Sequence, residues 1–269
     1  MGRILAFIYG IISYGLFLGT YCYAIAFVGD FGVPKTINSG ELGAFWPSLF
    51  INAGLLSLFA LQHSGMARPG FKKWWTKIIP EPIERSTYVL LASASLILLY
   101  WFWQPMAGTI WTVENETVRW ILWGLFGFGW ALVVYVTFLI SHAHLFGLTQ
   151  VRDFMKDREL WSPKFQTPNL YQHMRHPMML GFFFAFRAIP DMTVGHLLFS
   201  IATTSYILVA LQLEERDLID AFGVRYRKYL EQVPMLIPWP GHKSVVNVEE
   251  KNTEPASSNR KNSNIQMGK

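Results

Sequence analysis

Long apolar runs dominate this sequence. Four of them lie at residues 4–28, 44–62, 87–104 and 118–140. Each run is long enough to cross a hydrocarbon core of ~30 Å as a helix that rises about 1.5 Å per residue. Trp46 and Trp103 lie near the ends of such runs, where an amphipathic ring suits the membrane–water interface. Because 52% of the residues are hydrophobic and only 15% are charged, an all-α integral membrane protein is predicted rather than a soluble domain.

A fifth apolar region, residues 178–213, is interrupted by Ile189-Pro190-Asp191. Its first arm, 178–189, corresponds to roughly 18 Å of helix, which is too short to cross the bilayer. The second arm, 193–213, is long enough. We therefore expect a helix-turn-helix hairpin that returns to the membrane face it left. The sequence thus predicts about five transmembrane helices, the last of them a broken hairpin.

Basic residues are distributed unequally among the connecting loops. Loops 63–86 and 141–177 each contain five Lys or Arg residues, whereas loop 29–43 contains only Lys35 and loop 105–117 contains none. By the positive-inside rule, the N-terminus, both basic loops and the C-terminus face the cytoplasm. The Lys and Arg residues form no long basic stripe, so no nucleic-acid partner is expected.

Residues 1–240 and 241–269 differ in composition. The first segment holds all the apolar runs, so we expect a single membrane domain. The second is rich in Asn, Ser, Lys and Glu and has few large apolar residues, which predicts a disordered tail. Cys22 is the only cysteine, which excludes an intramolecular disulfide and a zinc site built from cysteines. No metal site is expected.

Polar and ionisable residues gather at the two feet of the predicted hairpin, which are the segments 171–177 and 214–215. Ionisable groups at a bilayer boundary cost free energy, so such a cluster indicates a functional site. His176 and Pro177 predict a helix start, whose free amides favour an anionic group. Glu214 can hold a cationic group, an amine or a ribose. Together the feet suit a zwitterionic ligand.

The segment 214–231 is predicted to continue the second arm into the cytoplasm as an amphipathic helix. Its apolar face has a spacing of three to four residues and consists of Leu218, Phe222, Tyr226 and Tyr229. One interpretation is that this face covers the membrane mouth of the site. The other is an interfacial helix that lies on the lipid, with its basic side chains extended to the headgroups.

An ordered set of short motifs resembles the isoprenylcysteine carboxyl methyltransferase superfamily of membrane enzymes. The motifs are Arg175-His176-Pro177, Glu214-Glu215, Phe222-Gly223-x-x-Tyr226-x-x-Tyr229 and Val233-Pro234-x-x-Ile237-Pro238. Upstream segments resemble, more particularly, the bacterial methanethiol S-methyltransferases. These segments are Gln62–Pro69, Pro82–Thr87, His144–Leu148 and Met192–His196. The resemblance implies an enzyme of the bacterial inner membrane that uses S-adenosyl-L-methionine as methyl donor.

The resemblance also implies residues that contact this donor. They are Gln166, Tyr171, His176, Pro177, Met178, Met179 and Glu214. Two positions depart from the superfamily pattern. Met179 stands where a tyrosine is frequent, and Ala210 stands where the prenylcysteine enzymes carry an arginine. The missing arginine favours a small acceptor without a carboxylate, so the resemblance implies S-methylation of methanethiol to dimethyl sulfide.

Methyl transfer from a sulfonium to a thiolate is helped by a nearby cation or base that favours the thiolate. The candidates for this catalytic role are His142, His144, His173, His176 and Arg187, of which His142, His144 and Arg187 are the ones predicted to be catalytic. The alternative for the two histidines is a capping or interfacial role, since no third ligand is spaced for a metal. The alternative for Arg187 is an ion pair with Asp191 that stabilises the turn of the hairpin.

Two other functions remain open at the level of the sequence. The first is a related membrane enzyme, either a methyltransferase for a lipid, a prenylcysteine or a larger thiol, or a nicotinamide-dependent sterol-type reductase. The second is a non-enzymatic membrane protein resembling the denitrification-associated NnrU group. Binding of S-adenosylmethionine distinguishes the second alternative from a methyltransferase.

Overall fold

The computed structural model describes residues 2–159 and 165–238. Five helices are long and apolar enough to cross a membrane: α1 (Arg3–Gly29), α2 (Phe45–Ala67), α4 (Glu81–Phe102), α5 (Glu116–Ile140) and α9 (Val194–Phe222). The shorter helices are α3 (Pro69–Trp75), α6 (His142–Leu145), α7 (Leu148–Met155), the 3₁₀ helix η1 (Asn169–Gln172), α8 (Pro177–Arg187) and α10 (Val224–Gln232). The predicted all-α integral membrane fold with five spans is confirmed. The predicted tail, 241–269, lies outside the described residues.

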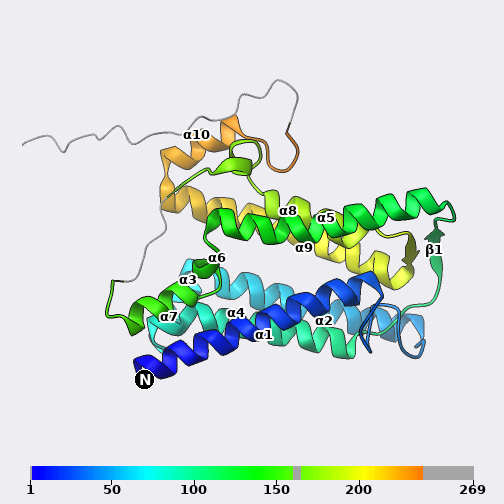
Figure 1. The fold of residues 1–269 in the computed structure, drawn as a ribbon, viewed down its shortest axis with the longest axis horizontal. Helices are drawn as coiled ribbons and strands as arrows, with labels where there is room; N and C mark the ends of the chain where they lie inside the picture. Colours follow the sequence, from blue (N-terminus) through cyan, green and yellow to red (C-terminus); the bar gives the residue numbers. More distant parts are fainter. Residues whose placement is uncertain (1, 160–164, 239–269) are drawn as a thin grey trace, which may run out of the picture.

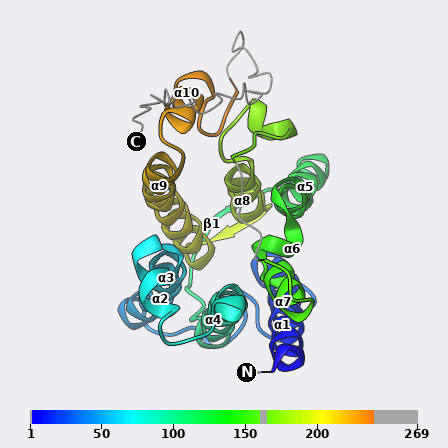
Figure 2. The same cartoon turned by 90° about the vertical axis from the view of Figure 1, so that its left-hand side faces the viewer.

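The long helices lie side by side in two rows (Figures 1 and 2). One row contains α9, α8 and α5, and the other contains α2, α4 and α1. The start of α1 and the helices α3, α7 and α10 lie at one end of the bundle, and the strands lie at the other. The basic loops therefore share one end, as the charge distribution predicts.

The closest helix contact joins α5 to α8 through two glycines. A Cβ on Gly129 would lie 2.5 Å from the amide nitrogen of Ala185 and 2.6 Å from the carbonyl oxygen of Gly181. A Cβ on Gly181 would lie 2.8 Å from the carbonyl oxygen of Gly129. Small residues let helix backbones approach in a membrane, where lipid supplies no hydrophobic force between helices. This contact fixes α8, and with it one foot of the hairpin.

Gly129→Leu is expected to lower the free energy of unfolding by about 1–3 kcal/mol, because the added side chain forces α5 and α8 apart. Thermal unfolding in detergent measures the effect. Gly127→Leu is the matched control, since a Cβ at Gly127 meets nothing within 4 Å. Equal unfolding temperatures for the two variants would contradict the assigned contact.

The predicted hairpin is confirmed, and its turn contains an unpredicted strand. Strand β2 (Asp191–Thr193) pairs antiparallel with β1 (Thr109–Thr112), with Thr112 opposite Asp191 and Thr109 opposite Thr193. The guanidinium of Arg119 donates to both carboxylate oxygens of Asp191, at 3.0 and 2.8 Å. The alternative that Asp191 pairs with Arg187 is therefore wrong. The turn is instead tied to the first turn of α5 through Arg119 and to the preceding loop through β1.

The prediction of one continuous helix over 214–231 is wrong, because the chain breaks at Gly223. This residue has φ 58° and ψ −127°, a conformation that glycine adopts without a Cβ clash. The break turns α10 back over the end of α9. Tyr226, Tyr229 and Val233 are buried there against Phe165, Leu218 and Phe222. The apolar face predicted from the spacing thus packs on protein rather than on lipid.

Candidate functional site

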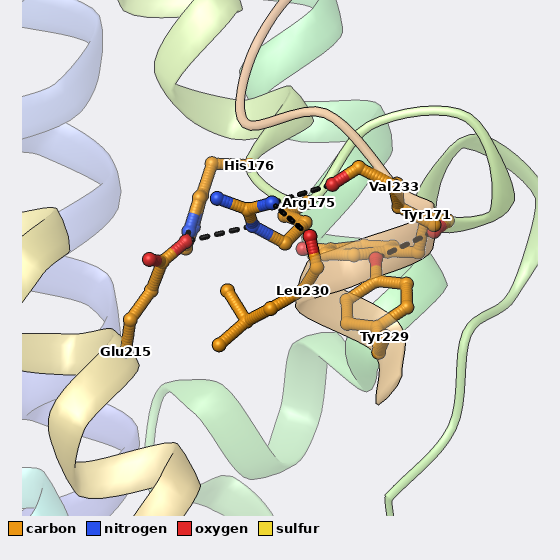
Figure 3. A network of polar contacts seen from close by, with 7 residues as sticks. All are labelled: Tyr171, Arg175, His176, Glu215, Tyr229, Leu230 and Val233. Atoms are coloured by element: carbon orange, nitrogen blue, oxygen red, sulfur yellow. Dashed lines mark hydrogen bonds and ion pairs between the residues drawn. The ribbon is translucent and has the colours of Figure 1, made fainter. Parts of the chain in front are cut away.

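The two feet of the hairpin meet through one carboxylate (Figure 3). Oε1 of Glu215 accepts a hydrogen bond from Nε of Arg175 at 2.8 Å and lies 3.0 Å from Nε2 of His176. The three side chains are only 10%, 7% and 14% exposed for Arg175, His176 and Glu215. The prediction that the two feet can meet is confirmed. Their contact is a buried ionic centre.

Arg175 also holds the last turn of α10 and the residues that follow it. Its Nη1 donates to the carbonyl oxygens of Leu230 and Val233, at 3.1 and 2.5 Å (Figure 3). Its own backbone amide donates to the carbonyl of Pro234 at 2.9 Å. The guanidinium therefore joins three segments that are distant in sequence. Because an arginine has five N–H donors in a fixed fork, it can serve several acceptors at once.

The local sequence explains why these side chains face each other. His176 has φ −131° and ψ 63°, a non-helical conformation imposed by the following proline, and Pro177 occupies the first turn of α8. The chain before α8 is held by Tyr229, whose hydroxyl donates to the carbonyl of Tyr171 at 2.5 Å. The first foot is thus fixed from both sides.

Glu214 differs from its neighbour Glu215. Its side chain is exposed, and within residues 2–159 and 165–238 no hydrogen bond or ion pair joins it to another group. It does interact electrostatically with the phenols of Tyr171 and Tyr226. A carboxylate placed among phenols without a cation of its own is available to a ligand.

Tyr171 contributes a neutral hydrogen-bond donor beside this carboxylate. Burial, then the charge of Glu214, raises the pKa of the Tyr171 phenol above its ordinary value. Burial likewise raises the pKa of Tyr226 and of Tyr229. These phenols therefore stay protonated at neutral pH.

Most of the predicted donor-contacting residues lie at the two feet. Pro177 is buried in the first turn of α8, where Met178 and Met179 are half-buried. Gln166 is exposed and follows Phe165, which packs on Tyr226 and Tyr229. His176 contacts Glu215 through Nε2, and its contact with the methyl donor stays a prediction. Arg175 and Glu215 were absent from the predicted site, although both lie within the quoted motifs.

The predicted catalytic histidines lie in α6, after α5. His142 has partners at both ring nitrogens, the hydroxyl of Tyr14 at 2.8 Å and that of Thr137 at 2.7 Å. Burial lowers the pKa of its imidazole. His144 lies 3.2 Å from the side-chain amide of Gln150. Its pKa is lowered by burial and by the charge of Arg85. The catalytic role of these histidines stays a prediction.

Arg187 lies apart from the feet of the hairpin. It ends α8, roughly 16 Å along the helix from His176 at about 1.5 Å per residue. Its guanidinium donates to the carbonyl of Ser200 at 2.9 Å and to the hydroxyl of Thr204. It also stacks on Phe183. These contacts tie the two arms of the hairpin together near its turn.

The fold and the site define a class of protein: a multi-pass helical membrane protein with a charged site at the feet of a broken hairpin. A methanethiol S-methyltransferase of Mycobacterium tuberculosis is 52% identical over 240 residues, which cover 89% of this chain and 98% of that protein. A methanethiol S-methyltransferase of Crocosphaera subtropica is 48% identical over 244 residues, covering 91% and 96% of the two chains. This chain belongs to the methanethiol S-methyltransferase family.

More distant relatives share part of the chain. Nurim of Xenopus laevis is 32% identical over 178 residues, which cover 62% of this chain and 61% of that protein. No family model matches the chain. No solved structure matches it either. The family assignment therefore rests on the methyltransferases, which align over almost their whole length.

Proposed function

We propose that this protein transfers the methyl group of S-adenosyl-L-methionine to the sulfur of methanethiol, giving dimethyl sulfide and S-adenosylhomocysteine. The observation that carries this function is its similarity, at about half of all positions, to methanethiol S-methyltransferases matched over nearly their whole length. The donor site is formed by the two feet of the hairpin. The acceptor reaches it from the membrane, since methanethiol is small and apolar.

The residues at the feet suit the methyl donor. S-Adenosylmethionine carries an amine, a carboxylate, a ribose and a cationic sulfonium. Glu214, which lacks an ion-pair partner among the described residues, is suited to the amine or the ribose. The Met178 amide in the first turn of α8 has no acceptor within its helix and is suited to the carboxylate. Tyr171 adds a neutral donor, and the methionine side chains provide apolar walls.

The chemistry favours a site with little water. The donor is a cation and the reactive acceptor is a thiolate, so charge disappears as the new C–S bond forms. A membrane-embedded pocket solvates separated charges poorly and therefore lowers the barrier. Ala210 fits the small acceptor, because this part of α9 carries no cation for a substrate carboxylate.

The donor site faces the cytoplasm in this proposal, with both termini on that side of a bacterial inner membrane. The loop charges support this orientation, since the basic α3 and α7 regions gather at the same end of the bundle as α10 (Figure 1). S-Adenosylmethionine is water-soluble and is made inside the cell, so a cytoplasmic mouth gives it direct access.

The test uses the purified protein in detergent, mixed with methanethiol and S-adenosylmethionine, with headspace dimethyl sulfide as the readout. Time-dependent dimethyl sulfide is the expected result. Turnover of a prenylcysteine instead of methanethiol would assign the protein to a different methyltransferase class. Failure to bind S-adenosylmethionine would reject the methyltransferase function altogether.

Residues 241–269 are proposed to form a tail outside the catalytic domain. The Mycobacterium tuberculosis relative is matched over 98% of its length by 240 residues, whereas this chain has 269. Truncation after Pro240 is therefore expected to leave the rate of dimethyl sulfide formation within about twofold. A larger loss at equal amounts of folded protein would place part of the tail in the catalytic machinery.

A further inference from the structure

A second polar cluster lies between the two rows of helices, inside the membrane-spanning part. The ring nitrogens of His63 on α2 both lie 3.0 Å from the hydroxyl of Tyr88 on α4. The hydroxyl of Ser64 lies 3.1 Å from that of Tyr206 on α9. Three spanning helices thus contribute polar groups to one place. Polar groups at membrane depth are costly, which indicates a function for this cluster.

The imidazole of His63 is positioned by aromatic neighbours. Phe59 stacks on it with ring centroids 5.1 Å apart, and the Tyr88 ring is tilted against it with centroids 5.2 Å apart. A phenol can donate to a neutral imidazole and accept from a protonated one, so Tyr88 serves both states. His63 is only half-buried, whereas Tyr88 is 6% exposed. His63 is therefore less enclosed than its partner Tyr88.

The charge of Glu214 in the proposed donor site also acts on the tyrosines of this cluster. Glu214 interacts with Tyr88 and with Tyr206, and it also interacts with Tyr171 at the first foot. Tyr206 and Glu214 are both on α9, roughly 12 Å apart along the axis at about 1.5 Å per residue. A donor molecule bound at Glu214 thus has the cluster on its membrane side.

A positive charge accompanies the cluster. The guanidinium of Arg85 lies 4.6 Å from the ring centre of Tyr88. Its Nε donates to the carbonyl of Leu145 at 2.7 Å, which fixes its position. A thiolate formed beside His63 would be stabilised by this cation.

We propose that His63 is the catalytic base that accepts the proton of the thiol, with Tyr88 as its positioning residue. The S–H bond breaks, and the proton moves to the imidazole. The sulfur lone pair forms the new bond to the methyl carbon, while the old C–S bond of the sulfonium breaks and its electron pair stays on S-adenosylhomocysteine. The proton leaves His63 for water after the products depart.

Other histidines are less suited to this step. Both nitrogens of His142 have protein partners, and His176 is bound to Glu215. His196 is 0% exposed and lies in the first turn of α9, next to β2 at the end of the bundle opposite to the feet. His142 is also partly exposed between two hydroxyls, but His63 belongs to the cluster in which the charge of Glu214 acts on Tyr88.

This inference rests on the proposed function, and the experiment separates the two. His63→Gln is compared with the wild-type protein for S-adenosylmethionine affinity and for dimethyl sulfide formation between pH 6 and pH 10. We expect unchanged donor affinity and about a hundredfold lower turnover at neutral pH, the usual effect of losing a general base. Turnover of the variant should then rise about tenfold per pH unit, because only thiol already ionised in solution reacts.

The outcomes are distinct. A wild-type protein that makes no dimethyl sulfide rejects the proposed function itself. An active wild type together with a His63→Gln variant of equal rate and equal pH profile overturns the role of His63 alone. Loss of donor affinity in the variant would assign a structural role to His63 and would also overturn its role as base.

Tyr88→Phe is the second variant, with an expected turnover about tenfold lower and a rate rising toward high pH. An unchanged rate and profile would contradict Tyr88 as positioning residue.

Discussion

Glu214→Ala is expected to weaken S-adenosylmethionine binding by about tenfold to a hundredfold without lowering the unfolding temperature. The carboxylate is exposed and has no ion pair within the described part of the chain, so its loss leaves no buried partner behind. A hydrogen bond to a charged group contributes about 1.5–3 kcal/mol, which corresponds to this change in affinity. Calorimetric titration of the detergent-solubilised protein measures it.

Glu231 provides the matched control for this variant. It is an exposed glutamate on α10, outside both feet of the hairpin. Glu231→Ala is expected to bind the donor like the wild type. Equal dissociation constants for Glu214→Ala and the wild type would remove Glu214 from the donor site.

Glu215→Ala, in contrast to Glu214→Ala, is expected to act mainly on stability, with a loss of about 3 kcal/mol in the free energy of unfolding. Removing one partner of a buried ion pair leaves the other charge without compensation, which typically costs 3–5 kcal/mol. The lower end is appropriate here because Arg175 keeps the carbonyl oxygens of Leu230 and Val233. The unfolding temperature in detergent is the measurement.

A second comparison separates charge from shape at this position. Glu215→Gln keeps the volume and one acceptor oxygen, so it should recover part of the stability that alanine loses. Glu215→Ala is expected to weaken donor binding only indirectly, through displacement of the first foot. An unfolding temperature for Glu215→Ala equal to that of Glu214→Ala would show that the buried centre does not hold the feet together.

The spans and the hairpin could be predicted because the bilayer imposes them. A segment in hydrocarbon must satisfy its own backbone, so apolar length and helix are linked. The interruption at Ile189-Pro190-Asp191 likewise predicted the turn. Strands β1 and β2 were missed because four and three residues carry too little alternation to detect. The partner of Asp191 was missed because Arg119 lies 72 positions away in the sequence.

The sequence predicted where the site lies, but not which side chains pair within it. Adjacent glutamates at 214 and 215 lie about 100° apart on a helix, so their roles depend on how α9 is rotated toward the first foot. Sequence alone does not supply that rotation, and it was Glu215 that paired with Arg175. His63 was visible as an ionisable residue beside a span, which is a signal of function. Its partner Tyr88 belongs to another helix and required the structure.

The turn of the hairpin is secured in a different way from its feet. At the turn, a strand pair and a two-fold arginine–aspartate contact join the hairpin to the rest of the bundle. At the feet, α8 and α9 are joined across the ionic centre by a single carboxylate. The hairpin is thus fixed at its turn by several contacts and held together at its feet by the side chain of Glu215. Any separation of the two feet would have to break the contacts of Glu215 with Arg175 and His176, whereas the turn would stay joined through β1 and Arg119.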